Sequence, residues 1–184
     1  MKAALLQSVC GNYGDFIDLT SSRNRSYAEK VGFDYVLHEN LFDHGRHPAW
    51  NKIFSVQLLF EQGYEYVFFM DGDAVVIDSS KNIMDLVEND NILIHFCSDK
   101  ADGAPVKCQP VRGAPLVVYQ NSLYNINSGV FLIKRHYLTK KFLKNVIDTP
   151  EISSHLNRNW EQEAIQEEIK CNLSLYSSIM KVYP

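Results

Sequence analysis

The sequence has no apolar stretch approaching the roughly 20 residues that a membrane-spanning helix needs. Its first residues also lack the basic region and the full hydrophobic region of a secretory signal. Lysine and arginine form no continuous block, and the net charge is −4, so neither nucleic acid nor a membrane surface is favoured as a partner. Together these absences predict a cytoplasmic protein without a membrane span.

Cysteine pairs are also missing. None of the four cysteines lies in a C-x-x-C arrangement, which disfavours a zinc site. Cys10 and Cys97 lie in apolar, strand-like surroundings that are typical of small core residues. We therefore expect reduced thiols rather than a disulfide framework.

What is present is ordinary for a globular chain. The 184 residues are 46% hydrophobic and 22% charged, which suits one domain spanning 1–184 with a sizeable core. Because the chain is acidic, it would need a metal ion or local cations to handle anionic phosphates.

The most informative stretch is an apolar run, residues 64–70, that ends at Asp71-Gly72-Asp73. The run is typical of a strand buried on both faces of a parallel sheet, and ligands of such sheets bind at the carboxyl ends of the strands. Asp71 and Asp73 would repel each other unless a cation or proton lay between them. An Asp-x-Asp pair also arises by chance, but its position directly after this run favours a metal or phosphate site.

Periodicity predicts strands alternating with helices, which favours an α/β fold with a mostly parallel sheet. A long segment with several prolines and glycines, 100–124, is typical of a functional loop. The predicted strands are 3–10, 33–38, 64–70, 91–96 and 130–133. The predicted helices are one ending near Lys30, then 50–62, 83–88, 137–147 and 160–170. Gly32 and Gly63 are the expected stop signals of the first two helices.

Four segments in order, Trp50-Asn51-Lys52, the strand with its Asp-x-Asp unit, 127–132 and 161–164, carry a family resemblance. The set resembles the GT-A-type glycosyltransferases, most closely the retaining galactosyl-, mannosyl- and xylosyltransferase family and more distantly the glycogenin-like and lipopolysaccharide galactosyltransferase group. The resemblance implies a Rossmann-like GT-A fold. It also implies transfer of a sugar from a nucleotide-sugar donor, UDP-linked, to a glycan or glycoconjugate acceptor with retention of configuration.

The resemblance also implies a site. Asp71 and Asp73 would hold Mn²⁺ or Mg²⁺, with one of them also contacting the donor ribose. Asn127, with Ser128 and Gly129 beside it, would line the donor-sugar pocket. Gln162 would lie beside the anomeric carbon, where its amide oxygen could stabilise positive charge.

Three further residues have weaker assignments. Asp99 matches an acidic residue that contacts donor-sugar hydroxyls in the distant group. Lys52 could face the diphosphate as a point charge, and Tyr13 could stack on the uracil base.

Each assignment has a plainer alternative. Ser128 and Gly129 could form an ordinary turn before a strand, Lys52 could be a surface lysine, and Tyr13 a partly buried turn residue. Gln162 could be a solvated side chain on a charged helix face. The remaining expectations are ordinary: Glu161 and Glu163 as surface charges, and Trp50 as a core residue.

The chain departs from the family pattern at one point. The family supplies a third metal ligand from a histidine near its carboxyl terminus, and none of the six histidines matches that position. Either the chain is the N-terminal part of a longer protein, or water and donor phosphate complete the site.

Two alternative functions remain open at this stage. Met70-Asp71-Gly72-Asp73 also fits the first motif of haloacid-dehalogenase-type phosphatases, with Asp71 as nucleophile and Asp73 as acid/base. That motif normally follows the first strand of its domain, whereas two predicted strands precede it here. The other alternative is a sugar-nucleotide-binding domain without turnover.

Overall fold

A computed structural model describes residues 1–9, 15–39, 45–88, 91–98, 126–149 and 160–183. Within these ranges the strands form one six-stranded sheet in the order β2-β1-β3-β5-β4-β6. Their bounds are β1 Ala3–Ser8, β2 Asp34–His38, β3 Tyr66–Asp71, β4 Ile94–Ser98, β5 Ile126–Lys134 and β6 Met180–Tyr183.

The sheet is mixed but mostly parallel, as the sequence predicts. β1 lies parallel to both β2 and β3, and β4 lies parallel to β6. β5 is the exception, because it runs antiparallel to both of its neighbours, β3 and β4. The strand β6 was not predicted, since only four residues near the end of the chain form it.

Two glycines end helices as predicted. Gly32 follows the first long helix with φ 78°, and Gly63 follows the second with φ 92°. Both values lie in the left-handed region, where glycine avoids the steric cost of a Cβ atom. The helices are α1 Asp15–Val31, η1 Pro48–Trp50, α2 Asn51–Glu61, η2 Ile83–Glu88, α3 Tyr137–Asp148, α4 Trp160–Cys171 and α5 Leu173–Tyr176, where η marks a 3₁₀ turn.

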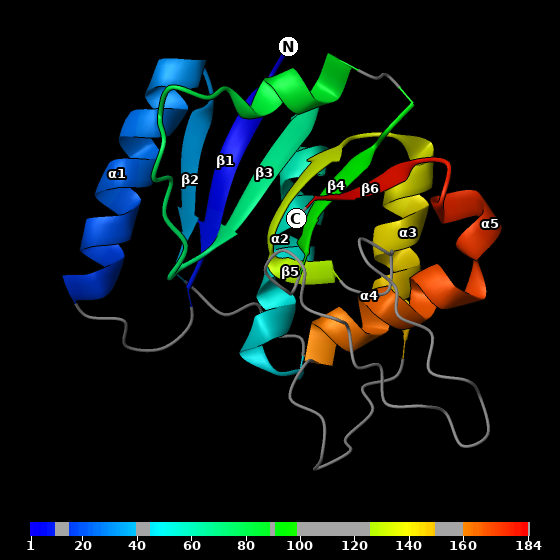
Figure 1. Ribbon diagram of the computed structural model, residues 1–184. Coiled ribbons are helices and arrows are strands. Elements are labelled where there is room, and N and C mark those ends of the chain that lie inside the picture. The colour runs from blue at the N-terminus through cyan, green and yellow to red at the C-terminus, as the bar shows by residue number, and fades with distance from the viewer. Residues whose placement is uncertain (10–14, 40–44, 89–90, 99–125, 150–159, 184) are drawn as a thin grey trace.

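Helices cover both faces of the sheet (Figure 1). Alternate residues of β1 divide between the faces, because successive side chains of a strand point in opposite directions. Ala3 and Leu5 pack with α1 and with the segment after β3. Ala4 and Leu6 pack in the larger cluster, to which α2, α3, α4 and α5 contribute.

Two local predictions are corrected by the structure, and two are confirmed. Residues 127–129 lie inside β5 rather than in a turn before it, and the predicted helix 83–88 is a 3₁₀ turn. Trp50 is fully buried, as expected of a core residue, and Cys97 is a free thiol. Among the described residues, no helix is long and apolar enough to cross a membrane. The predicted loop 100–124 lies outside the described residues.

Candidate active site

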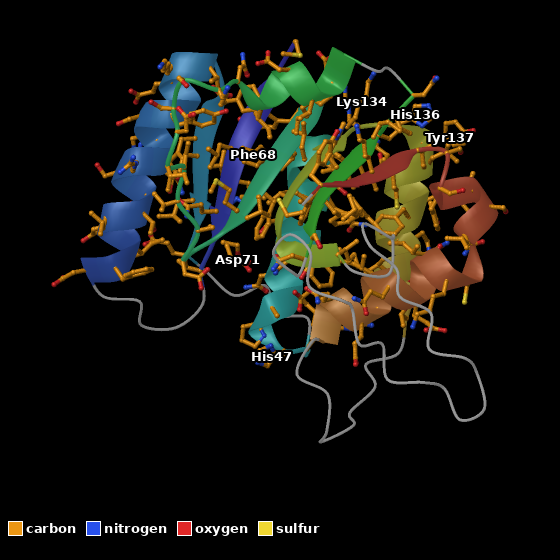
Figure 2. The ribbon with its side chains drawn as sticks, viewed as in Figure 1. His47, Phe68, Asp71, Lys134, His136 and Tyr137 are labelled. Atoms are coloured by element: carbon orange, nitrogen blue, oxygen red, sulfur yellow. The ribbon has the colours of Figure 1, made fainter. Side chains whose placement is uncertain are left out.

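The acidic pair lies at the carboxyl end of β3, where the apolar run predicted it. Asp71 is the last residue of that strand, and a hydrogen bond from the Ala74 amide to the Asp71 carbonyl, 3.0 Å, closes the turn that contains Asp73. Figure 2 shows Asp71 at the lower end of β3, at the opposite end of the sheet from Lys134 and His136. The Asp71 side chain is 39% exposed, and Asp73 is exposed, so both carboxylates remain accessible to a ligand.

A buried lysine, Lys52, forms an ion pair with Asp71. Lys52, in the first turn of α2, places its Nζ 3.0 Å from Asp71 Oδ1 and 2.9 Å from Glu161 Oε1. The same ammonium donates to the Ser128 carbonyl at 3.3 Å. Its three N–H groups thus match three protein oxygens, from β3, α4 and β5. A contact between Lys52 and a phosphate would require one of these bonds to exchange.

Lys52 carries one positive charge, whereas the nearby Asp71, Asp73 and Glu161 side chains carry up to three negative charges. Burial alone lowers the pKa of Lys52, but the neighbouring carboxylates of Glu161 and Asp71 outweigh it and raise that pKa. The pKa of Asp71 is also raised, first by burial, and further by the nearby Glu161 and Asp73 carboxylates, although Lys52 opposes the shift. The raised pKa of Lys52 thus follows from its two carboxylate partners, whereas the raised pKa of Asp71 follows first from burial and then from the other carboxylates.

Glu161 corrects a sequence prediction. We expected a surface charge there, but the residue is only 5% exposed and pairs with Lys52. It lies in the first turn of α4, where the helix dipole favours a negative charge. The neighbouring Glu163 is partly exposed, as a charge on the outer side of that turn would be.

Gln162 is likewise buried, at 9% exposure, so the alternative of a solvated side chain is wrong. Its Oε1 accepts from the Ser128 amide at 3.0 Å. The Ser128 hydroxyl lies 2.9 Å from Glu161 Oε1 and 3.2 Å from Gln162 Oε1. A hydroxyl has one proton, and the shorter distance favours donation to Glu161. The Gln162 oxygen then accepts from Ser128 only through the backbone amide.

Asn127 and Gly129 bring β5 against Asp71. The Asn127 Oδ1 accepts from the Gly129 amide at 2.7 Å. A Cβ atom on Gly129 would lie 2.6 Å from Asp71 Oδ2 and 2.8 Å from Asn127 Oδ1. Glycine is therefore required here because the Asp71 carboxylate lies directly over the backbone, a role that the sequence did not indicate.

Gly129→Ala is expected to push the Asp71 carboxylate away from Lys52. Cβ contacts below 3.0 Å are essentially never seen, so a neighbouring group must move. The cost of such overpacking is about 1–3 kcal/mol of unfolding free energy, measured by urea denaturation. In an Asp71→Ala background the same substitution should cost less, because the 2.6 Å contact is gone and only the 2.8 Å contact with Asn127 Oδ1 remains. Equal costs in both backgrounds would contradict this contact.

The donor atoms suit a hard divalent cation. Asp71 and Asp73 offer only oxygen, the ligand type that Mg²⁺ and Mn²⁺ prefer. Three carboxylates and one ammonium leave the cluster of Asp71, Asp73, Glu161 and Lys52 with two unbalanced negative charges. Among the described residues, no three His, Cys, Asp or Glu side chains are grouped to hold an ion. The two aspartates would therefore share the ion with oxygens from elsewhere, such as those of a diphosphate.

The structure brings most of the predicted site together. Lys52, Asp71, Ser128 and Gln162 form one connected network, with Asn127, Gly129 and Asp73 beside Asp71. Tyr13 and Asp99 lie outside the described residues.

The sequence pattern of the galactosyl transferase GMA12/MNN10 family matches residues 10–183. No curated protein sequence matches the chain.

Solved structures share the fold. One is a glycosyltransferase involved in the glycosylation of the major capsid of PBCV-1, with a TM-score of 0.70 and 16% identity over 100% of this chain and 81% of that chain. A second is A197 from STIV, with a TM-score of 0.54 and 15% identity over 100% of this chain and 82% of that one. A third is 4-diphosphocytidyl-2C-methyl-D-erythritol synthase from Anaerococcus prevotii DSM 20548, with a TM-score of 0.52 and 11% identity over 99% and 88% of the two chains. At these identities the likeness concerns the fold alone.

Proposed function

Because this chain belongs to the galactosyl transferase GMA12/MNN10 family, we propose that it moves a sugar from a UDP-linked donor to a glycan or glycoconjugate acceptor with retention of configuration. The phosphatase alternative has no support from the family match, which covers nearly the whole chain. The alternative of a domain without turnover is also disfavoured, because the matching family is one of transferases.

The observation that carries the proposal is the excess negative charge that the described residues leave at the carboxyl end of β3. Lys52 offsets one of the three negative charges, and the Asp71 and Asp73 side chains remain accessible to solvent. A divalent cation held there would act as a Lewis acid on the departing diphosphate. This assignment is also consistent with an acidic chain that handles an anionic substrate.

The chain's own residues would then divide the remaining work. Asn127, with Ser128 and Gly129, would position the donor sugar against Asp71. The amide oxygen of Gln162 would stabilise positive charge at the anomeric carbon. Lys52 would act through Asp71 rather than by direct contact with the diphosphate, since its three N–H groups are already engaged. Contact of Tyr13 with the base and of Asp99 with the sugar hydroxyls stays a prediction.

The proposed step balances as a substitution at carbon. The bond from the anomeric carbon to the diphosphate oxygen breaks, and a bond to the acceptor oxygen forms on the same face of the sugar. The acceptor's hydroxyl proton passes to the departing phosphate oxygen. Gln162 takes no proton in this scheme, because an amide is not a general base at neutral pH.

Donor binding should raise the melting temperature only when metal is present. With Mn²⁺ and a donor at about 100 times its Kd, stabilisation is about 2.7 kcal/mol, or roughly 5–10 °C for a chain of this size. We would compare UDP-galactose, UDP-glucose, UDP-xylose and GDP-mannose, each with Mn²⁺ and with EDTA, and then measure release of sugar from the best ligand. Hydrolysis of an aryl phosphate without stabilisation by any nucleotide-sugar would favour the phosphatase instead.

A further inference from the structure

The residues that follow β3 belong to no strand, yet side chains of α1 bind their backbone at alternate positions. The Thr20 hydroxyl donates to the Gly72 carbonyl at 2.8 Å. The Asn24 amide donates to the Ala74 carbonyl at 2.9 Å, and its oxygen accepts from the Val76 amide at 2.9 Å.

Two more polar side chains extend this set on either side. Arg23 donates to the Val76 carbonyl at 2.8 Å and to the Ile77 carbonyl at 3.0 Å. On β1, Gln7 donates to the Asp71 carbonyl at 3.2 Å and is itself held by the Tyr35 hydroxyl at 2.7 Å. Side chains therefore bind the backbone at the first two residues of the Asp-Gly-Asp turn and after it.

Three of these side chains, those of Gln7, Thr20 and Asn24, lie where apolar residues would be expected. Gln7 and Asn24 are fully buried, and Thr20 is 3% exposed. Thr20 and Asn24 are four residues apart, so they share one face of α1 and reach the segment together. Asn24 also begins an Asn-Arg-Ser sequon, but both polar atoms of its buried side chain are engaged, so it is not an exposed acceptor for a glycan.

Plain structural need explains part of this arrangement, because a buried backbone outside a sheet must find hydrogen-bond partners. The positions of these bonds, at and beside the two aspartates, also suggest a role in the site. They fix Gly72 between the two aspartates and Ala74 immediately after them, so they determine the directions in which Asp71 and Asp73 leave the backbone. The groups that orient metal ligands commonly tune metal affinity in this way.

We propose that Thr20 and Asn24 are positioning residues for the Asp71–Asp73 pair, with Gln7 holding the same turn from β1. This inference rests on the proposed function, because it assumes that the pair binds a divalent cation together with UDP. The α1 face holds the two carboxylates at a fixed separation before any ligand arrives. Preorganisation of this kind saves the free energy of ordering the turn on binding.

Thr20→Val tests the inference, since it keeps the shape of the side chain and removes the hydroxyl. We expect the affinity for Mn²⁺ in the presence of UDP, followed by the electron paramagnetic resonance of free Mn²⁺, to fall about tenfold, as for other groups that orient a metal ligand. Thr20→Ser keeps the hydroxyl and should restore most of the affinity. Ser26→Ala on the exposed side of α1 is the matched control and should change nothing, because among the described residues that hydroxyl bonds its own helix, at the Ser22 carbonyl.

Two readouts separate positioning from loss of folded protein. A variant that merely unfolds lowers the number of sites per chain, whereas a misplaced turn lowers the affinity at full stoichiometry. Without metal, hydrogen exchange at the Ala74 and Val76 amides should quicken in Thr20→Val but not in Ser26→Ala.

Each outcome bears on one of the two proposals. Wild-type protein that fails to bind Mn²⁺ with UDP would refute the proposed function. Wild-type binding with unchanged affinity in Thr20→Val would overturn the positioning role instead, as would unchanged exchange at the turn.

Discussion

Replacing Lys52 with methionine is expected to destabilise the protein by about 3–5 kcal/mol, the range seen when one partner of a buried ion pair is removed. Lys52 is the cation between Asp71 and Glu161, and the Glu161 side chain is only 7% exposed. Without the ammonium, the described part of the chain leaves the buried carboxylate with the Ser128 hydroxyl but with no positive charge beside it. Urea denaturation would measure the loss, which is a large share of the 5–15 kcal/mol typical of folded domains.

A matched surface variant and a double mutant make this expectation specific. Lys144 pairs with Asp148 on the exposed side of α3, so Lys144→Met should cost less than about 1 kcal/mol. Adding Glu161→Gln to Lys52→Met removes the stranded charge and should recover part of the stability. If both lysine variants lose the same amount, the buried network does not support the fold as its distances indicate.

Asp73→Ala is expected to abolish metal-dependent UDP binding while leaving the fold intact. Groups that only orient metal ligands cost 10–100-fold in affinity, so loss of a direct ligand should cost at least about 100-fold. Asp73 is exposed, and surface substitutions usually change stability by less than about 0.5 kcal/mol. Titration calorimetry of UDP with and without Mn²⁺ would measure the first effect, and thermal unfolding without ligand the second.

Asp85→Ala provides the control for Asp73→Ala. Asp85 is also an exposed aspartate, in η2, and its loss should leave Mn²⁺-dependent UDP binding unchanged. Asp73→Asn keeps the shape but not the charge, and should bind nearly as poorly as the alanine variant. Unaltered UDP affinity in both Asp73 variants would place the cation elsewhere.

Long periodic segments were predictable because burial leaves a direct mark on composition. The apolar run before Asp71 predicted a buried strand ending at an acidic turn, and β3 ends there. Gly32 and Gly63 predicted the ends of two helices, since glycine tolerates the positive φ common at helix ends. Both residues adopt it. The alternation of strands and helices predicted the mostly parallel sheet, but not the reversed direction of β5, which depends on which strands become neighbours.

Glu161 shows what local pattern could not supply. Its sequence neighbours are polar and acidic, so the surrounding segment is typical of a solvated helix turn. Only the packing of α4 against η1, α3 and β5 buries that turn and brings Lys52 within reach. The same is true of Thr20 and Asn24, whose partners lie 52 and 50 residues away along the chain.

The order of residues alone therefore determined the class of fold, the strand that ends in the acidic pair, and the family to which the chain belongs. The tertiary structure decided that Lys52 faces inward, that Glu161 is buried, and that Gly129 has to be a glycine beneath Asp71. The physical reason is the distance along the chain over which each effect acts. Propensity and periodicity act over a few neighbouring residues, whereas charge pairing and steric contact act between atoms that only folding brings within a few ångströms of each other.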